Sequence, residues 1–547
     1  MALSPMKLED EIKRRRTVAI ISHPDAGKTT LTEKFLLYGG AVQEAGAVRA
    51  RKNQRSATSD WMEMERKRGI SVTSTVLQFP YGDYVMNLLD TPGHQDFSED
   101  TYRILTAVDS VIMVIDAAKG IETQTLKLFE VCRKRMIPIF TFINKMDRPT
   151  RDPLDLLDEI EKVLQIGVYP INWPLGTGFE FKGVFDRLAK QVHLFERTTG
   201  GAYKAPVAVG GIAEAFVQET LEPEVYAQVV EELEMLDIAG EEFNHAEVLS
   251  GMITPVFFGS AMNNFGVQLL LDNIFKYAPS PGSYPSSLGQ LEPTREDFSG
   301  FVFKIQANMD PKHRDRIAFV RICTGKYSKN LAVHHSRTGR KVKLSNAHTL
   351  FGQERESVEE AFAGDIVGLI SSDRFGIGDT LSETSGLIYE GIPYFAPEHF
   401  IFLNNPNPSN YKRYRDGLDQ LLQEGVIQGF ELHTHSSNNY ILGAVGPLQF
   451  DVVQYRLESE YKAETERIPA NWSVLRWVDP EIDPARLDRS ILPVGAISGK
   501  DRDGNAVLLF TNDWSMKLFM DKQPEIKLAD TPFRAGLISL KLSGKGR

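Results

Sequence analysis

Short apolar runs recur through the first half of the chain, and each one ends in small or polar residues. They span residues 18–21, 84–89, 111–115, 137–143 and 255–258. After the first run, Leu31, Phe35 and Leu36 lie at helical spacing. Continuous apolar runs of this length are typical of strands that are buried on both faces of a parallel sheet. The pattern predicts an α/β domain with a parallel-rich sheet over residues 1–280.

The pattern changes twice after this domain. Residues 281–292 continue a stretch rich in Pro, Gly and Ser, which predicts a linker. Short apolar segments then alternate with Gly, Asn and Asp turns over residues 298–383, which favours a β-barrel domain over residues 293–388. From residue 394 to about 466 the order is strand, helix, strand, strand, helix. This order predicts an α+β ferredoxin-like C-terminal domain over residues 389–547.

The first domain also contains more chain than one sheet needs. Helical patterns at 154–164 and 216–236, with a strand-like stretch at 173–196, predict an inserted subdomain at about residues 165–250. In the last domain, helical patterns occupy residues 415–422 and 449–461. A short charged helix is predicted at residues 9–16, because this stretch is acidic at first and then basic.

The turn after the first apolar run has the order of a phosphate-binding loop, from strand through loop to helix. Backbone N–H groups of such a loop cradle phosphates. Lys28 is predicted to reach the β and γ oxygens, and the Thr29 hydroxyl to bind Mg²⁺. A serine stands where the general pattern has its first glycine. The predicted nucleotide-binding residues here are Ser22, His23, Pro24, Asp25, Ala26, Gly27, Lys28, Thr29 and Thr30.

Two further motifs follow strand ends. Asp90 ends the second apolar run and is followed by Thr91, Pro92, Gly93 and His94. An aspartate at the carboxyl end of a strand beside a phosphate loop can hold Mg²⁺, and a following glycine can approach the γ-phosphate with its N–H.

The third motif is Asn144, Lys145, Met146 and Asp147. A carboxylate in the plane of a purine accepts two hydrogen bonds from guanine and none from adenine at the same edge. Asp147 is therefore predicted to select guanine. Three such motifs in this order predict binding of GTP or GDP with Mg²⁺.

These motifs resemble those of the translational GTPases. The resemblance implies that Ser71, in the stretch 68–72, completes the Mg²⁺ shell from an extended first switch within residues 31–90. It also implies that His94 orients or activates the attacking water, so His94 and Lys28 are the expected catalytic residues. Asn144 and Lys145 would brace the phosphate loop and cover the base. A backbone N–H of Ser260 or Ala261, in the last guanine motif, would meet the guanine oxygen.

Composition limits the alternatives. The net charge of −11 argues against non-specific nucleic-acid binding as the main activity. Local basic patches at 13–16, 49–55, 66–68 and 337–343 remain candidates for RNA contact, although each is more often a solvated surface. Two cysteines, no signal segment and no long apolar run predict a cytoplasmic, soluble protein. His433 and His435 lack nearby metal-binding partners in the sequence, so they are not expected to bind a metal.

The domain order resembles that of elongation factor G and its relatives. The chain has no room for the two further domains of a translocase. Its length, the Ser22–Asp25 form of the phosphate loop and the segment 446–450 look most like the GTP-hydrolysing peptide chain release factors of bacteria. This resemblance implies a monomeric GTPase, stimulated by the ribosome through large-subunit rRNA and stalk proteins, that promotes departure and recycling of class-1 release factors.

Three alternatives stay open at this point. A metabolic kinase with a phosphate loop would not need Asp147, and a non-hydrolysing guanine-nucleotide scaffold would not need His94. Another GTPase of the elongation factor G group, acting in ribosome protection or elongation, is the nearest alternative.

Overall fold

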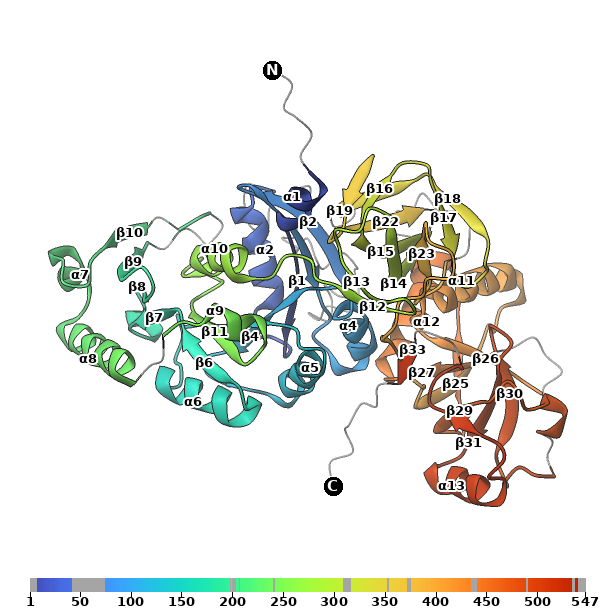
Figure 1. Ribbon diagram of the computed structural model, residues 1–547. Coiled ribbons are helices and arrows are strands. Elements are labelled where there is room, and N and C mark those ends of the chain that lie inside the picture. Colours follow the sequence, from blue (N-terminus) through green and yellow to red (C-terminus); the bar gives the residue numbers. More distant parts are fainter. Residues whose placement is uncertain are drawn as a thin grey trace.

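The molecule consists of three consecutive parts (Figure 1): the first two share one extended sheet, and the C-terminal part has a sheet of its own. The computed structural model describes residues 7–41, 74–196, 198, 203–205, 207–239, 242–307, 316–351, 354–370, 375–433, 440–487, 490–533 and 537–539. Among these residues, no helix is both long enough and apolar enough to cross a membrane.

The first part is an α/β unit whose sheet has the order β2-β3-β1-β4-β5-β11-β6. All neighbours are parallel except β2 and β3. The five predicted apolar runs fall in five adjacent strands of this sheet, and each of these strands is buried along nearly its whole length. The strands are β1 (Arg15–Ser22), β2 (Thr75–Tyr81), β3 (Tyr84–Asp90), β4 (Ser110–Asp116), β5 (Ile139–Asn144), β6 (Gly167–Pro170) and β11 (Ile253–Phe258).

Helices pack against this sheet and connect its parallel strands (Figure 1). The carboxyl ends of the parallel strands therefore lie at the same edge of the sheet. α6 begins where the Asp152 side chain accepts the N–H groups of Leu154 and Asp155, with Pro153 in its first turn. The helices are α2 (Lys28–Tyr38), α4 (Ser98–Ile104), α5 (Thr123–Lys134), α6 (Pro153–Leu164), α9 (His245–Leu249) and α10 (Val267–Tyr277). The short helix η1 (Gln95–Phe97) precedes α4.

A small antiparallel sheet is inserted between β6 and α9, at the end of the molecule away from the C-terminal domain (Figure 1). The helical pattern predicted over 216–236 is in fact two helices, because the chain is extended at Leu221 and Pro223 restarts the helix. The elements are β7 (Asn172–Leu175), β8 (Gly183–Asp186), β9 (Gln191–Phe195), β10 (Val207–Gly210), α7 (Ala215–Thr220) and α8 (Pro223–Ala239).

The segment predicted as a linker contains a short hairpin, β12 (Tyr284–Ser286) and β13 (Gly289–Leu291). The hairpin is the only pairing that β12 and β13 make with a named strand among the described residues. Pro285 is tolerated because the hairpin has only two strands, both at an edge. Ser286 is further held by its Oγ, which donates to Gly289 O at 2.8 Å.

The second part is a curled antiparallel unit, as its turn-rich pattern predicts. Its sheet continues that of the first part, because β19 pairs with β2 through Phe351 and Leu77. The strands are β14 (Ser299–Ala307), β15 (Arg316–Thr324), β16 (Lys326–Ser328), β17 (Leu331–His335), β18 (Lys341–Leu344), β19 (Ala347–Phe351), β20 (Glu354–Ser357), β21 (Glu360–Phe362), β22 (Ile366–Ile370) and β23 (Thr380–Ser382).

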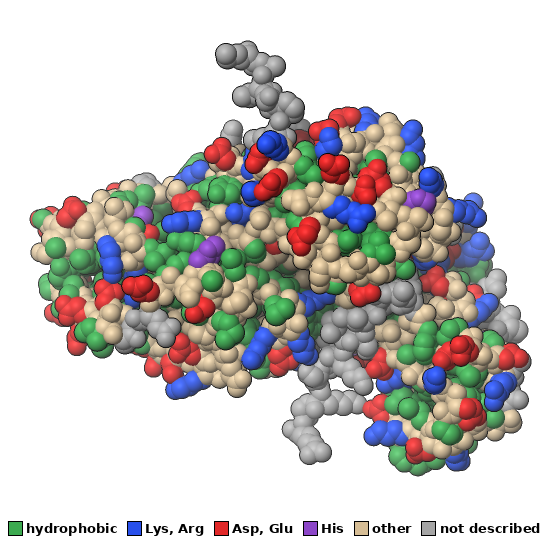
Figure 2. Space-filling model, viewed as in Figure 1, with side chains coloured by type: hydrophobic (Ala, Val, Ile, Leu, Met, Phe, Trp, Pro, Cys, Tyr) green, Lys and Arg blue, Asp and Glu red, His purple; other side chains and the backbone are tan. Residues whose placement is uncertain are grey.

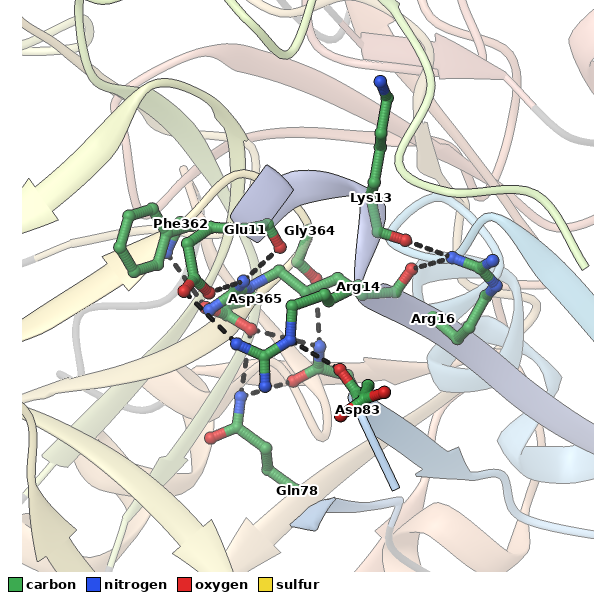
Figure 3. A network of polar contacts seen from close by, with 11 residues as sticks. Glu11, Lys13, Arg14, Arg16, Gln78, Asp83, Phe362, Gly364 and Asp365 are labelled. Atoms are coloured by element: carbon green, nitrogen blue, oxygen red, sulfur yellow. Dashed lines mark hydrogen bonds and ion pairs between the residues drawn. The ribbon is translucent and has the colours of Figure 1, made fainter. Parts of the chain in front are cut away.

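Buried polar groups join these two parts, and Figure 3 shows Asp365 of the second part beside Gln78 of the first. Arg15 Nε donates to Asp365 Oδ2 at 2.8 Å, and both side chains are less than 10% exposed. Arg321, on β15, makes two hydrogen bonds to Asp109 of the first part, at 2.9 and 2.7 Å. The predicted helix at 9–16 is instead α1 (Leu8–Lys13), because Arg15 and Arg16 enter β1 and are buried. This burial removes both arginines from the candidate RNA-binding patch at 13–16.

The C-terminal part contains the predicted ferredoxin-like layer. β25 (His399–Asn404), β26 (Gln428–Leu432), β27 (Ile441–Ala444) and β28 (Glu466–Pro469) have the order β28-β25-β27-β26. α11 (Tyr411–Glu424) and α12 (Leu448–Tyr461) pack on this layer. The same sheet continues through further strands, so the domain is larger than the predicted layer. The remaining elements are β24 (Ile392–Tyr394), β29 (Val474–Val478), β30 (Ile497–Asp501), β31 (Ala506–Phe510), α13 (Asp513–Lys522), β32 (Leu528–Ala529) and β33 (Leu537–Ser539).

Candidate nucleotide-binding site

The predicted phosphate loop lies between β1 and α2 at the carboxyl edge of the sheet. Asp25 and Gly27 both have positive φ, at 67° and 99°, which turns the chain sharply before the helix. Gly27 directly precedes α2, so the loop meets the helix N-terminus, where free N–H groups favour anions. A sharp turn that ends at a helix N-terminus is an arrangement that can bind a phosphate chain.

Lys28 and Asp90 form a buried ion pair at this edge. Lys28 is the first residue of α2 and Asp90 is the last of β3, so the pair joins the predicted phosphate lysine to the predicted metal carboxylate. Thr91 Oγ1 donates to Ile20 O at 2.6 Å, which fixes the end of β3 against β1. Asp90 and the hydroxyl of Thr29 supply oxygen donors, which suit Mg²⁺. The third predicted metal ligand, Ser71, lies outside the described residues.

Asn144 connects the three loops of the site. Its Nδ2 donates to Ala26 O at 2.8 Å, and its Oδ1 accepts the N–H of Ala261 at 2.9 Å. A Cβ added at Gly27 would collide with the same Nδ2. The carboxamide therefore ties the end of β5 both to the phosphate loop and to the last predicted guanine motif.

The predicted base-binding side is built from the turn after β5. Met146 is fully buried, and its N–H donates to Gly259 O at 3.1 Å. Ser260 is also buried and exchanges backbone hydrogen bonds with Phe265 at 2.9 and 3.0 Å. Asp147 follows Met146 in the same turn and is partly exposed. The two predicted guanine motifs are thus adjacent in space although more than a hundred residues separate them.

Asp116 belongs to this side of the site, and the sequence analysis missed it. Its Oδ2 accepts a hydrogen bond from Lys145 Nζ at 2.7 Å. Burial raises the pKa of the Asp116 carboxyl, but Lys145 and the N–H of Ala118 lower it more, so the net shift is downward. The available sequence signal was an aspartate directly after the apolar run 111–115, at the end of a predicted strand. In the structure, Asp116 is the parallel neighbour of Asn144.

His94 lies beside the phosphate loop. Its side chain is about a third exposed and lines a hollow together with Pro24, Gly93 and residues 121–124 and 127. A Cβ at Gly93 would lie 3.7 Å from Pro24 Cα, which shows how closely the two loops approach. His94 Nδ1 accepts the N–H of Asp96 at 3.2 Å. The same Nδ1 lies 3.4 Å from Asp96 Oδ1, so both the backbone and the side chain of Asp96 face this side of the ring.

His23 contributes to the loop in a different way from its neighbours. Its side chain is fully buried, and within the described residues neither ring nitrogen has a hydrogen-bond partner. Nε2 lies 3.7 Å from Glu122 Oε2. Burial lowers the pKa of the His23 imidazole, which favours the neutral ring. Its backbone O accepts the Ser22 hydroxyl at 2.8 Å, so it shapes the loop from within.

Of the two histidines His433 and His435, which were considered as a metal-binding pair, the structure describes only His433. His433 Nδ1 lies 3.0 Å from Ser498 Oγ, at the end of β26. His435 lies outside the described residues. No group of three or more His, Cys, Asp or Glu side chains able to hold a metal ion occurs in the part of the chain that the structure describes.

Comparison with known families agrees with this geometry. Residues 13–280 match the elongation factor Tu GTP binding domain, and residues 297–384 match elongation factor G domain 2. A solved structure of a protein from Thermus thermophilus has a TM-score of 0.66 at 22% identity, over 89% of this chain and 72% of that one, which supports the fold alone. The fold and the nucleotide site define a translational GTPase.

The C-terminal part and the whole chain narrow the class further. Residues 389–520 match the class II release factor RF3, C-terminal domain. The peptide chain release factor 3 of Gloeobacter violaceus is 58% identical over 96% of this chain and 99% of its own length. Those of Synechocystis and Rippkaea orientalis are 55% and 54% identical, over 95% and 97% of this chain and 95% and 98% of their own lengths. The chain belongs to the peptide chain release factor 3 family, so it is a GTPase of translation termination.

Proposed function

We propose that this GTPase promotes the dissociation and recycling of class-1 peptide chain release factors from the ribosome after peptide release. The observation that carries the proposal is the pair of hydrogen bonds from the Asn144 side chain to Ala26 and Ala261, which hold together the loops of a guanine-nucleotide site. This site occurs in a chain whose C-terminal domain is of the release factor 3 type. Such a combination couples a nucleotide-dependent change to a domain that is particular to termination.

The residues of the site have distinct proposed roles. The loop 22–30 and Lys28 bind the phosphates, and Lys28 offsets the negative charge that develops on them. Asp147 binds the guanine edge, while Asn144 and Lys145 hold the loops around the base. Thr29, Asp90 and Ser71 would hold Mg²⁺, which supplies further charge neutralisation when bound.

His94 has a positioning role in this proposal. Because its Nδ1 accepts the Asp96 N–H, its Nε2–H is the group able to face the attacking water. A donor at this place orients the water and takes little part in acid–base chemistry. The ribosome, through its large-subunit RNA and stalk proteins, would bring His94 to the water and thereby start turnover.

The surface is consistent with docking through local contacts. Figure 2 shows Lys and Arg side chains interspersed with Asp and Glu over the face in view, without one continuous basic region. A monomer in the cytoplasm that docks on the ribosome through small patches fits this surface and the net charge of −11.

The proposal is tested by release-factor dissociation. Post-termination ribosomes carrying a labelled class-1 release factor are mixed with the protein and GTP, and loss of the label is followed in time. We expect faster dissociation with GTP than with GDP. The Lys28→Ala variant serves as a binding-deficient control. Dissociation at the spontaneous rate with active, GTP-bound protein would contradict the proposed function.

A further inference from the structure

The turn that follows His94 packs directly against the C-terminal domain. Asp96 is 8% exposed although it is charged, and Phe97 packs with Val452 of α12. The contact brings the segment after β3 against a helix that begins more than 350 residues later in the chain. This segment therefore belongs both to the nucleotide site and to the interface.

Asp96 interacts with both sides of this contact. Its backbone N–H donates to His94 Nδ1 at 3.2 Å, and its Oδ2 accepts the N–H of Leu448 at 2.9 Å. Leu448 is the first residue of α12, a helix of 14 residues. A carboxylate at a helix N-terminus is stabilised by the free N–H groups and the helix dipole. One residue thus joins the ring of His94 to the start of α12.

The turn before α12 fits closely around Asp96. A Cβ added at Gly446 would lie 2.5 Å from Asp96 Cγ and 2.8 Å from its Cα, so only glycine allows this approach. Gln449 holds the turn in place, because its Oε1 accepts the N–H groups of Val445 and Gly446 at 2.8 and 2.9 Å. The contact on Asp96 is therefore both tight and supported from within the C-terminal domain.

We propose that Asp96 is a positioning residue for GTP hydrolysis, through which the docking of the α12 N-terminus sets the orientation of His94. When α12 holds the carboxylate, the Asp96 backbone is fixed, and with it the hydrogen bond to His94 Nδ1. When the C-terminal domain moves, this restraint is lost and the ring is free to turn. The inference rests on the role proposed above for His94.

The experiment measures ribosome-stimulated GTP turnover of the full chain, with kcat and the KM for ribosomes determined separately. Asp96→Ala removes the acceptor of the Leu448 N–H and the carboxylate oxygen that lies 3.4 Å from His94 Nδ1. We expect kcat to fall about tenfold, because a small loss of alignment is costly. The KM and the affinities for GTP and GDP should not change. Asp96→Asn keeps an acceptor oxygen and should restore part of the rate.

Gly446→Ala tests the same contact from the C-terminal domain. It adds one methyl group that collides with Asp96, and it changes no residue of the nucleotide site itself. We therefore expect a similar fall in kcat. Gly282→Ala is the matched control, because a Cβ there has no neighbour within 4 Å and φ is not positive. It should turn over at the parent rate.

A double-mutant cycle with His94→Ala separates positioning from a purely structural role. If Asp96 acts through His94, adding Asp96→Ala to His94→Ala should produce no further loss. Additive losses in the double variant would overturn the inference, and so would a parent kcat in either Asp96→Ala or Gly446→Ala. In both cases a slow His94→Ala variant would leave the proposed function intact. Parent turnover in His94→Ala would instead remove the proposed role of His94.

Discussion

Asn144 Nδ2 occupies the space that a side chain at Gly27 would need. The amide donates to Ala26 O at 2.8 Å, so the phosphate loop and the strand that ends in the guanine motif fit together only with glycine at this position. The positive φ of 99° adds a second reason.

Gly27→Ala should therefore weaken the binding of both GTP and GDP. The methyl group would displace Asn144, and the backbone would have to leave its left-handed conformation. GTP and GDP affinities should both fall by at least about tenfold, since strain of this kind costs roughly 1–3 kcal/mol. Gly40 has a φ of 73° and no atom near its Cβ position, so Gly40→Ala is the control for strain alone. Equal losses in the two variants would contradict the steric account.

Asp147→Asn should change the preferred nucleotide. Loss of the charged acceptor should weaken GTP binding by about 1–3 kcal/mol, because the guanine donors lose their partner. Xanthosine triphosphate has an oxygen in place of the amine and should bind relatively better. Competition between the two nucleotides for the parent and the variant measures this preference. A uniform loss for both nucleotides would remove Asp147 from the base-binding site.

His94→Ala should separate nucleotide binding from turnover. GTP affinity should stay near that of the parent, and ribosome-stimulated hydrolysis should fall by about 10² or more, as expected for loss of a water-positioning group. The variant should still release one class-1 factor per ribosome and then remain bound. Single-turnover dissociation and ribosome pelleting measure the two steps, and rapid departure of the variant would contradict the prediction.

The buried ion pair of Arg321 and Asp109 should contribute more to the free energy of unfolding than an exposed ion pair does. Arg321 is fully buried, so Asp109→Ala would leave its guanidinium without a carboxylate between the first two domains. We expect the free energy of unfolding to fall by about 3 kcal/mol. Asp158, whose pair with Lys162 is largely exposed, provides the control variant Asp158→Ala, expected to change stability by less than about 0.5 kcal/mol. Denaturant titration compares them.

Asp379 should make stability depend on acid pH. Burial raises the pKa of its carboxyl, but the hydrogen bond with His335 and the ion pair with Arg337 outweigh burial and lower the pKa to about 2. A carboxyl whose pKa is lowered by folding stabilises the protein above its unfolded pKa of about 4 and loses this contribution as pH falls toward 2.

The stabilisation amounts to about 2 kcal/mol above pH 4. It is measured as the difference in unfolding free energy between the parent and Asp379→Asn, which should be largest near neutral pH and should shrink between pH 4 and pH 2. A difference that stays constant over this range would contradict the assignment.

Much of the fold could be predicted because the relevant signals are local in the sequence. Each apolar run of the first domain is long enough to mark a strand buried on both faces, and the loop at 22–30 carries its own chemistry in consecutive residues. The predicted helix at 9–16 extends too far at its C-terminal end, because contacts distant in the sequence place Arg15 and Arg16 in β1. Arg15 has its partner in Asp365, 350 residues away, and no local pattern reveals that pair.

The site residues divide in the same way. Asp147 and Lys28 stand in recognisable motifs, whereas Asp116 gains its role only because β4 lies parallel to β5. The contact of Asp96 with Leu448 depends on how two domains meet, and the sequence holds no periodicity that indicates it.

The joint between β2 and β19 has a consequence for synthesis of the chain. β2 is an edge strand of the sheet in the first domain, and Leu77 receives its partner Phe351 only after 274 further residues have been made. Until then a growing chain presents an open strand edge, the kind of surface on which other chains pair and aggregate. The second domain thus acts as an edge cover for the first, and fragments that stop near residue 280 should aggregate more readily than the full chain.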